Sequence, residues 1–363
     1  MANIPRRNGG PAARIAVVPG DGIGREVTPE SVKVLRAAVK RPMEFVEFDW
    51  GAEKFLREGV TLPAGAVEML RDEFDAILFG ALGDPRVPSN QHAAEILLGL
   101  RFKLDLYVNA RPVVLLDDRL TPLRGRTVRD IRLIIIRENT EGLYAGVGGF
   151  FKKGTPDEVA VQEDVNTRKG VERIIRYAYE YARLNGLKRL CMSDKSNALT
   201  YAHDLWQRVF KEVRAEYAEI DSRHLYIDTL AMEMVRDPGQ FDVIVTCNLF
   251  GDILSDLGGQ LAGGLGLAPS ANIHPGRTSL FEPVHGSAPN IAGKGIANPL
   301  GSVLASALML DFLGWKAEGD ALRGAVKAAL QEKRVTPDLG GELSTAAVGD
   351  SLCAYLTKNA VRA

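Results

Sequence analysis

Two carboxylates lie four residues apart at the start of a predicted helix, just after the apolar run from Phe241 to Val245. This spacing puts Asp252 and Asp256 on one helix face, where like charges repel by about a few tenths of a kcal/mol. A divalent cation between them would remove the repulsion, so the pair predicts a metal site. Asp228, if it is more than a helix cap, would complete a set of oxygen ligands that suits Mg²⁺ or Mn²⁺ better than zinc.

Three arginines stand at the predicted ends of helices and strands, and together they indicate an anionic ligand. Arg101 falls late in a helix, Arg111 at the end of a strand, and Arg137 directly after another strand. Guanidinium groups bind carboxylates through two parallel hydrogen bonds, so three that converge would hold a di- or tricarboxylate. Taken singly, each arginine could equally form an ordinary surface salt bridge.

Three further residues could react. Tyr144, beside arginines and a bound metal, could have its pKa lowered enough to exchange protons, although a tyrosine is more often a packed aromatic residue. Lys195 follows the predicted strand Arg189 to Met192, at the edge where α/β proteins bind ligands, and is otherwise a loop lysine. Cys247 has no indicated histidine partner, so we interpret it as a small buried residue rather than a nucleophile.

The dinucleotide fingerprint Gly-x-Gly-x-x-Gly is absent after the first predicted strand. The segment Gly20 to Gly24 has different glycine spacing and an acidic residue within it, which disfavours an ordinary Rossmann site. The run Glu282 to Gly293 is a better cradle for phosphate or ribose, because its glycines allow close backbone approach and its polar groups suit the edges of adenosine. By composition alone it could also be an ordinary long loop.

The composition favours an enzyme for small molecules. Its 45 Lys and Arg residues against 46 Asp and Glu leave a net charge of -1 with no basic block, so neither nucleic acid nor a membrane is an expected partner. No apolar run approaches the ~20 residues of a membrane-spanning helix, and Met1 to Arg14 is interpreted as a loose tail rather than a signal peptide. Three scattered cysteines without metal spacing fit a reducing cytoplasm.

Short strands alternate with amphipathic helices along most of the 363 residues, which predicts an α/β fold with a mainly parallel sheet and, from the length, two domains. The pattern breaks between Tyr144 and Val161, where glycines and aromatics predict a projecting hairpin that meets another subunit. A helix is expected at Gln91 to Lys103, with Ala93, Ala94, Leu97, Leu98 and Leu100 on its apolar side. The other predicted elements are strands at 14–18, 43–48, 75–79, 106–112, 131–137 and 189–192, and helices at 25–39, 64–74, 169–184, 199–216, 299–313 and 320–331.

In order and wording, these segments resemble the metal-dependent β-decarboxylating dehydrogenases, the family of isopropylmalate, isocitrate, homoisocitrate and tartrate/D-malate dehydrogenases. The resemblance implies an isopropylmalate dehydrogenase-like α/β fold. A large open-sheet domain would comprise residues 1–106 and 263–363, and a smaller α/β middle domain, 107–262, would carry a dimer arm at about 145–162. The matching segments are Pro19–Gly24, Val108–Pro112, Arg137–Gly142, Asp194–Asn197, Gly251–Asp256, Phe281–Pro289 and Ile296–Pro299.

The resemblance also implies roles for individual residues in a homodimer or tetramer with shared active sites. Lys195 would accept the hydroxyl proton and Tyr144 would protonate the enol. Lys195 and Asp228 would enter from the partner subunit. The residues implied to bind the substrate are Arg101, Arg111, Arg137, Leu97, Leu98 and Asp228, and the implied metal ligands are Asp228, Asp252 and Asp256. Those implied to bind the coenzyme are Glu282, His285, Gly286, Ser287, Ala288, Asn290, Ile291 and Asn298.

Substrate and coenzyme follow from departures within this pattern. Leu97 and Leu98 fall where isopropylmalate enzymes place an apolar pair, and Glu95 would repel a third carboxylate. The first hypothesis is therefore oxidative decarboxylation of 3-isopropylmalate to 2-oxo-4-methylpentanoate, a step of leucine biosynthesis. Tartrate or D-malate is the alternative, because those enzymes carry a similar pair and Ala94 departs from the glutamate usual for bacterial isopropylmalate enzymes. Homoisocitrate and isocitrate come next.

NAD is the expected coenzyme. Asn290 stands where NAD-specific members carry an aspartate that repels a 2′-phosphate, so NADP stays open. Ile291, in place of the tyrosine of NADP enzymes, keeps NAD ahead. A non-catalytic regulatory subunit is the hypothesis of a different class, and it would lack a catalytic or metal residue, yet none is missing.

Overall fold

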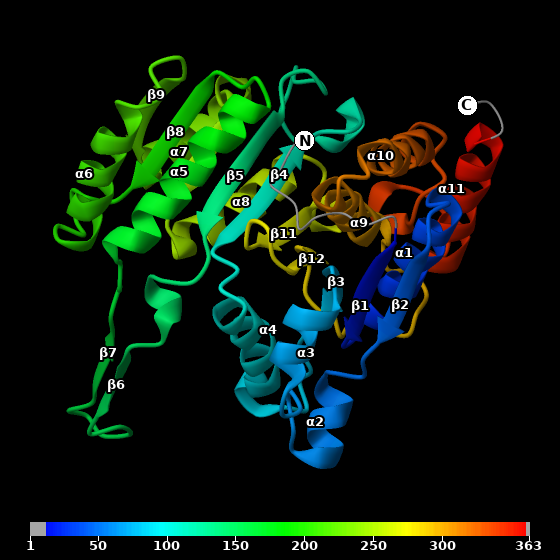
Figure 1. Ribbon diagram of the computed structural model, residues 1–363, viewed down its shortest axis with the longest axis horizontal. Helices are drawn as coiled ribbons and strands as arrows, with labels where there is room; N and C mark the ends of the chain where they lie inside the picture. The colour runs from blue at the N-terminus through cyan, green and yellow to red at the C-terminus, as the bar shows by residue number, and fades with distance from the viewer. Residues whose placement is uncertain (1–11, 361–363) are drawn as a thin grey trace.

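One ten-stranded sheet runs through the protein in the computed structural model, which describes residues 12–360 (Figure 1). Six of its nine strand pairings are parallel. The three antiparallel pairings follow one another in the middle of the sheet. In spatial order the strands are β2 (Met43–Glu47), β1 (Ala13–Gly20), β3 (Ala76–Ala81), β12 (Ser279–Pro283), β11 (Pro269–Ile273), β4 (Val108–Val114), β5 (Arg132–Glu138), β10 (Val243–Thr246), β8 (Arg189–Asp194) and β9 (Asp221–Tyr226).

Helices cover the two ends of the sheet, and a third group lies beyond β1 and β3 (Figure 1). Near β1 and β12 are α1 (Gly24–Ala38), α9 (Leu300–Leu313), α10 (Lys316–Gln331) and α11 (Thr345–Ala360). Around β5, β8 and β10 are α5 (Arg168–Leu184), α6 (Ala202–Arg214), α7 (Ile227–Arg236) and α8 (Asn248–Leu261). The third group is α2 (Ala52–Glu58), α3 (Ala66–Glu73) and α4 (Gln91–Lys103).

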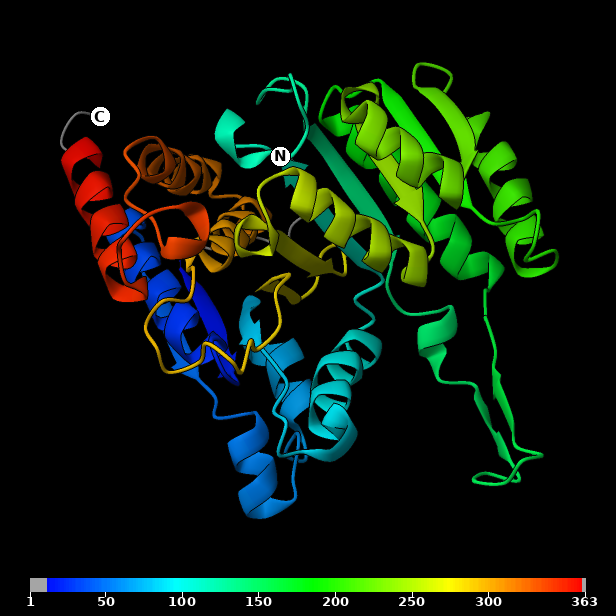
Figure 2. The same ribbon diagram turned by 180° about the vertical axis from the view of Figure 1, so that it is seen from behind.

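Alternate side chains of β5 point to opposite faces of the sheet, and this alternation determines which face Arg137 lies on. Ile134 and Ile136 join the core that holds α5 and α6, whereas Leu133 and Ile135 join a second core with α7 and α8. Successive side chains of a strand point to opposite faces, so Arg137 must share the α8 side with Leu133 and Ile135. Figure 2, seen from behind, has α7 and α8 in front of this part of the sheet.

A two-stranded hairpin projects from the molecule between β5 and α5 (Figures 1 and 2). It consists of β6 (Gly148–Phe151) and β7 (Val159–Gln162), whose residues are all exposed, with Phe150 and Phe151 61% and 65% accessible. It lies where the sequence predicted a projecting hairpin. The division into two domains stays a prediction.

Most predicted helices and strands are present with shifts of a few residues at their ends. The expected apolar side of α4 is wrong in part, because Ala94 is exposed while His92 and Ile96 are buried. His92 is tolerated there since its Nε2 lies 2.7 Å from the buried carboxylate of Asp21. The predicted tail at Met1 to Arg14 lies outside the described residues up to position 11. Within residues 12–360, no helix is long and apolar enough to cross a membrane.

Candidate active site

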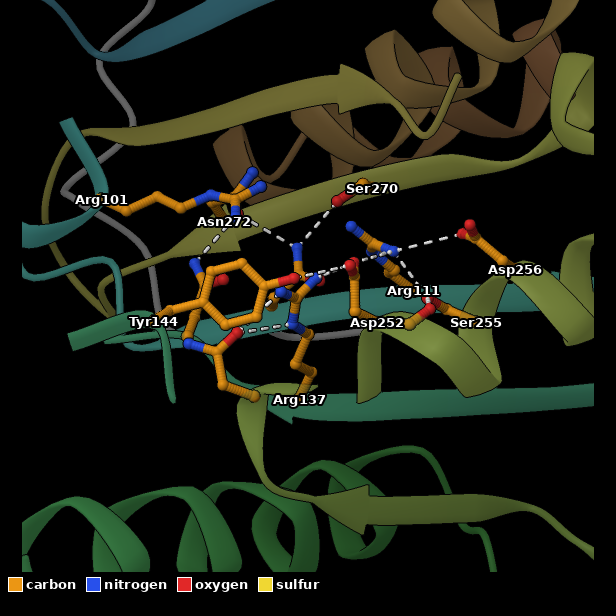
Figure 3. A network of polar contacts seen from close by, with 12 residues as sticks. Arg101, Arg111, Arg137, Tyr144, Asp252, Ser255, Asp256, Ser270 and Asn272 are labelled. Atoms are coloured by element: carbon orange, nitrogen blue, oxygen red, sulfur yellow. Dashed lines mark hydrogen bonds and ion pairs between the residues drawn. The ribbon is translucent and has the colours of Figure 1, made fainter. Parts of the chain in front are cut away.

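The three predicted arginines converge on one buried point (Figure 3). Arg101 comes from the last turn of α4, Arg111 from β4 and Arg137 from β5, and all three are buried. In the β4–β5 ladder Arg111 lies opposite Ile135, so it shares the face of Arg137 and sits diagonal to it. Arg111 lies inside β4 rather than at its end, because the strand continues to Val114.

Asp252 of α8 is the carboxylate on which these groups meet. Its Oδ1 accepts from Nη1 of Arg137 and lies 3.1 Å from Nη1 of Arg111, and its Oδ2 accepts from the hydroxyl of Tyr144 at 2.9 Å. Asp256, one turn later, lies 3.7 Å from Arg111. The predicted pair of aspartates thus occupies one face of α8 and points at the arginines (Figure 3). We call these residues, with Arg101, the arginine half of the site.

Three residues of α8 that the sequence did not single out hold this geometry. Asn248 Oδ1 accepts from Nε and Nη2 of Arg137 at 3.0 and 2.7 Å, and Ser255 Oγ accepts from Nη1 of Arg111 at 2.6 Å. At Gly251 a Cβ atom would lie 2.6 Å from the Cβ of Arg137, so only glycine allows α8 to pack this closely on β5. The signal available was their position on the helix that carries Asp252 and Asp256.

A buried polar ladder in the central antiparallel strands supports the arginines from the other side. Glu282 of β12 accepts from Arg101 at 3.1 Å and from Nδ2 of Asn272 at 2.8 Å. The Oδ1 of Asn272 accepts in turn from Asn109 and Asn139 at 3.1 and 3.0 Å. Glu282, assigned from the sequence to the coenzyme loop, therefore lies in β12 and pairs with Arg101. The asparagines were not predicted as site residues, although amides inside buried strands indicate such a network.

Charges balance in the arginine half. Three guanidinium groups face three carboxylates, those of Asp252, Asp256 and Glu282. Burial lowers the pKa of Arg111 and of Arg137, and the neighbouring arginines lower that of Arg137 further. The cluster is therefore neutral as a whole, and it would stay neutral with a dication and a dianion bound together, which are the charges of a metal ion and a malate-type dicarboxylate.

The carboxyl groups and Tyr144 are tuned by the same surroundings. Burial raises the pKa of Asp252, but Arg137 and Arg111 outweigh it, so the pKa is lowered. Burial raises the pKa of Asp256. It also raises that of Tyr144, and Asp252 adds to the increase. Among the protein groups alone, burial and Asp252 outweigh the arginines, so the lowered Tyr144 pKa expected beside a bound metal stays a prediction.

Lys195 and Asp228 form a separate pair, which we call the lysine half. The Nζ of Lys195 donates to Oδ1 of Asp228 at 2.8 Å, from the loop after β8 to the first turn of α7. The side chain of Asp228 is 61% exposed. Within the described part of the chain, no three His, Cys, Asp or Glu side chains gather closely enough to hold a metal ion. The structure therefore does not bring Asp228 to Asp252 and Asp256 within one chain.

The donors still fit Mg²⁺ or Mn²⁺ in kind. Asp252 and Asp256 offer only carboxylate oxygens, the ligand type these hard ions prefer, but two residues leave most of a six-ligand shell to other donors. Cys247, the N-cap residue of α8, is buried, as expected from the sequence, and burial raises the pKa of its thiol to about 12. That it has no catalytic or metal-binding role stays a prediction.

The predicted coenzyme loop packs against the turn after β1. The Ile23 N–H donates to the Ser287 carbonyl at 2.9 Å, and a Cβ at Gly22 would lie 2.1 Å from that oxygen. The Nε2 of His285 is buried and has no hydrogen-bond partner among residues 12–360, and the space around Gly286 is open. An unpartnered nitrogen beside accessible backbone fits the polar edge of a nucleotide.

The other residues of the predicted coenzyme loop differ in their exposure and in their contacts within the protein. Asn290 is exposed, whereas Ile291 and Ala288 pack against Ile23 and its neighbours. Asn298 is engaged within the protein, because its Nδ2 donates to Asp338 at 2.9 Å and its Oδ1 accepts from the Leu300 N–H. The contact of each with a coenzyme stays a prediction.

Known proteins are similar to this chain over nearly its whole length. The family model described as isocitrate/isopropylmalate dehydrogenase matches residues 14–352. The 3-isopropylmalate dehydrogenase of Thermobifida fusca is 47% identical over 344 residues, covering 93% of this chain and 96% of that protein. The decarboxylating D-malate dehydrogenase of Escherichia coli is 43% identical, with 95% and 99% covered. The crystal structure of isocitrate dehydrogenase from Methylococcus capsulatus superposes with a TM-score of 0.86 at 36% identity, covering 95% and 99%.

Proposed function

Because the chain belongs to the isocitrate/isopropylmalate dehydrogenase family, it is a metal- and NAD(P)-dependent decarboxylating dehydrogenase, and we propose that it acts on 3-isopropylmalate with NAD. The observation that carries the substrate proposal is on α4. Leu97 and Leu98 lie one helical turn before Arg101, on the same side of the helix, and both are half-buried. An apolar pair beside a carboxylate-binding arginine suits a dicarboxylate with a branched alkyl substituent.

The alternative substrates differ in what they require of α4. D-malate or tartrate needs no alkyl pocket, and the 43% identity to a D-malate dehydrogenase keeps this activity as the second candidate. Homoisocitrate and isocitrate carry a third carboxylate, which would need a further cation. The side of α4 that carries Leu97 and Leu98 offers no cation besides Arg101. The exposed carboxylate of Glu95, which accepts from Gln91 at 2.6 Å, would repel the third carboxylate.

The side chains of this protein would divide the work as follows. Arg101, Arg111 and Arg137 bind and orient the two carboxylates of the substrate. Tyr144, whose pKa is raised, carries its proton at neutral pH and can donate it to carbon after CO₂ leaves. Lys195 accepts the hydroxyl proton. A bound Mg²⁺ or Mn²⁺ would supply Lewis acidity at the hydroxyl oxygen, and the nicotinamide would accept the hydride.

The coenzyme proposal depends on two neighbouring residues. Asn290 is exposed and can hydrogen-bond to a ribose hydroxyl, but it carries no charge to repel a 2′-phosphate. Ile291 packs against the hydrophobic cluster around Ile23 and offers a phosphate no donor. We therefore propose a preference for NAD with measurable activity on NADP.

A homodimer is proposed because the two halves of the site do not meet in one chain. Exposed apolar side chains are available for association, namely Phe150 and Phe151 on the hairpin, Met232 on α7 and Ile253 on α8, which are 59–65% accessible. Ile253 adjoins Asp252, so an interface on this face would bring a second chain to the arginine half. We propose that the enzyme works in the cytoplasm, where the cysteines stay reduced.

A substrate panel tests these proposals. Initial rates are measured by nicotinamide absorbance with 3-isopropylmalate, D-malate, tartrate, isocitrate and homoisocitrate, each with NAD or NADP and with or without Mg²⁺. The highest kcat/KM is expected for 3-isopropylmalate with NAD and Mg²⁺. A higher kcat/KM for D-malate would replace the substrate proposal by the second candidate, and preference for isocitrate would overturn the argument from Leu97 and Leu98.

A further inference from the structure

His203 is a buried histidine that contacts the loop of Lys195, the helix α8 and the base of the projecting hairpin. It lies in the first turn of α6 and is fully buried. Its Nδ1 accepts the backbone N–H of Lys195 at 2.8 Å. Its ring also packs edge-on against Phe250, two residues before Asp252 on α8, with ring centroids 5.5 Å apart. No other function described above uses this residue.

The remaining ring nitrogen of His203 has one candidate partner. Its Nε2 lies 3.5 Å from Oδ2 of Asp164, and both atoms are buried without any other hydrogen-bond partner among the described residues. Since Nδ1 accepts a hydrogen bond, the neutral ring carries its proton on Nε2, directed at this carboxylate. Asp164 belongs to the base of the projecting hairpin, where the next residue, Val165, pairs with Gly142.

We propose that His203 is a positioning residue for Lys195 and that Asp164 holds it in the required tautomer, an inference that rests on the proposed role of Lys195. The lysine side chain is long and flexible, so its reach depends on how the backbone at its Cα is oriented. One hydrogen bond at the Lys195 N–H fixes that orientation from α6. A displacement of about 1 Å at a reacting group can cost on the order of 100-fold in rate.

The loop that carries Lys195 is also held by the side chain of Asp194, at a different position from the contact with His203. Asp194, also buried, accepts from the N–H of Ser196 at 3.0 Å and from His224 at 2.9 Å. Asp194 thus holds Ser196, and the Lys195 carbonyl accepts from the N–H groups of Ala198 and Leu199, whereas the Lys195 N–H is held by His203. Because Asp164 lies at the foot of the hairpin, His203 also connects that hairpin to the lysine half.

Kinetics of three variants and one control test the proposal in the full-length enzyme. His203→Phe keeps the ring against Phe250 but removes the acceptor, and kcat should fall about tenfold or more while KM changes less than about twofold. His203→Asn restores an acceptor near the Nδ1 position and should recover most of kcat. Asp164→Asn removes the charge that selects the tautomer and should lower kcat severalfold. Asp204→Ala, the neighbouring exposed residue that pairs only with Arg208, serves as control and should retain kcat.

Two measurements do not depend on turnover. The ¹⁵N shifts of the His203 ring should show the Nε2–H tautomer in the parent and a mixture in Asp164→Asn. Hydrogen exchange at the Lys195 amide should accelerate at least tenfold in His203→Phe and stay slow in the control. Unchanged exchange together with unchanged kcat would overturn the proposal, as would an Nδ1–H tautomer in the parent. If the parent turns over no 2-hydroxy acid, the proposed function fails while these two measurements still decide the role of His203.

Discussion

The arginine half and the lysine half of the site are built in opposite ways. Arg137 is 1% exposed and its guanidinium group donates to Asn248 and Asp252, because β4, β5 and α8 enclose it. Asp228 is 61% exposed and, among the described side chains, pairs with Lys195. The first half is preorganised within one chain. The second is a pair of charges presented at the surface, a difference that the proposed sharing of each site between two copies would explain.

Mixing two inactive variants gives the largest expected effect. Lys195→Met and Asp252→Asn should each lower kcat by on the order of 10²–10⁴-fold. If the halves of different chains form one site, a mixed dimer contains one intact site and one doubly altered site. Random exchange of subunits should then restore about a quarter of the parent activity, measured after unfolding and refolding the variants together. No recovery in dimers shown to have exchanged would mean that each chain carries its own complete site.

The next largest effect is a difference between the two halves in how much a substitution lowers the free energy of unfolding. Arg137→Met removes a buried guanidinium from Asp252 and Asn248, and the free energy of unfolding should fall by about 3 kcal/mol, since unpaired buried polar groups cost this much. Asp228→Asn alters an exposed pair and should leave that free energy unchanged within error. Urea unfolding at one protein concentration, followed by circular dichroism, measures both. Equal losses in the two variants would contradict the contrast.

Metal affinity tests whether the halves meet around one ion. Titration calorimetry with Mn²⁺ should give a dissociation constant on the order of tenfold higher for Asp228→Asn than for the parent, because one carboxylate ligand is lost. Asp256→Asn should weaken binding similarly. Lys195→Met, which removes no oxygen ligand, is the matched control and should bind Mn²⁺ as the parent does. Parent-like affinity in Asp228→Asn would exclude this residue from the metal site.

The smallest expected effect is a pH dependence of the free energy of unfolding, which comes from Asp194 in the loop of the lysine half. Burial raises the pKa of Asp194, but His224 and the Ser196 N–H lower it more, so its folded-state pKa lies below the unfolded value of about 3.9. Its stabilising contribution is therefore complete above about pH 4 and is lost as pH falls through the folded pKa. Relative to Asp194→Asn, the parent should lose on the order of 1 kcal/mol between pH 5 and 3 in urea titrations. Parallel curves would show that the carboxylate has no lowered pKa.

The sequence predicted which residues form the arginine half but not what holds them. Asp252 and Asp256 share a helix face because of local spacing, and that spacing is readable without a structure. Asn272 is different, because its partners Asn109 and Glu282 lie on other strands and only the sheet order brings them together. Asn272 also interrupts the apolar pattern of β11, and neither this strand nor β12 was predicted.

Burial on α4 and the pKa of Tyr144 both depend on contacts that local patterns do not show. His92 looks polar in sequence, but its contact with Asp21, 71 residues earlier, allows burial and changes the apolar side of the helix. For Tyr144 the sequence indicated the arginines, whereas burial raises its pKa most and Asp252, which accepts a hydrogen bond from its hydroxyl, raises it further. In both cases a carboxylate distant in sequence and the burial around it are properties of the folded chain.

The position of β12 has a consequence for how the protein is made. This strand, Ser279–Pro283, lies between β11 and β3, and β3 ends at Ala81. On a ribosome that adds about 5–20 residues per second, β3 would wait roughly 10–40 s for the neighbour that completes its pairing. Its apolar residue Leu78, which belongs to the core cluster that also holds Phe281 and α9, would be exposed to other nascent chains during that interval. We therefore expect the newly synthesised amino-terminal third to depend on chaperones until translation has passed β12.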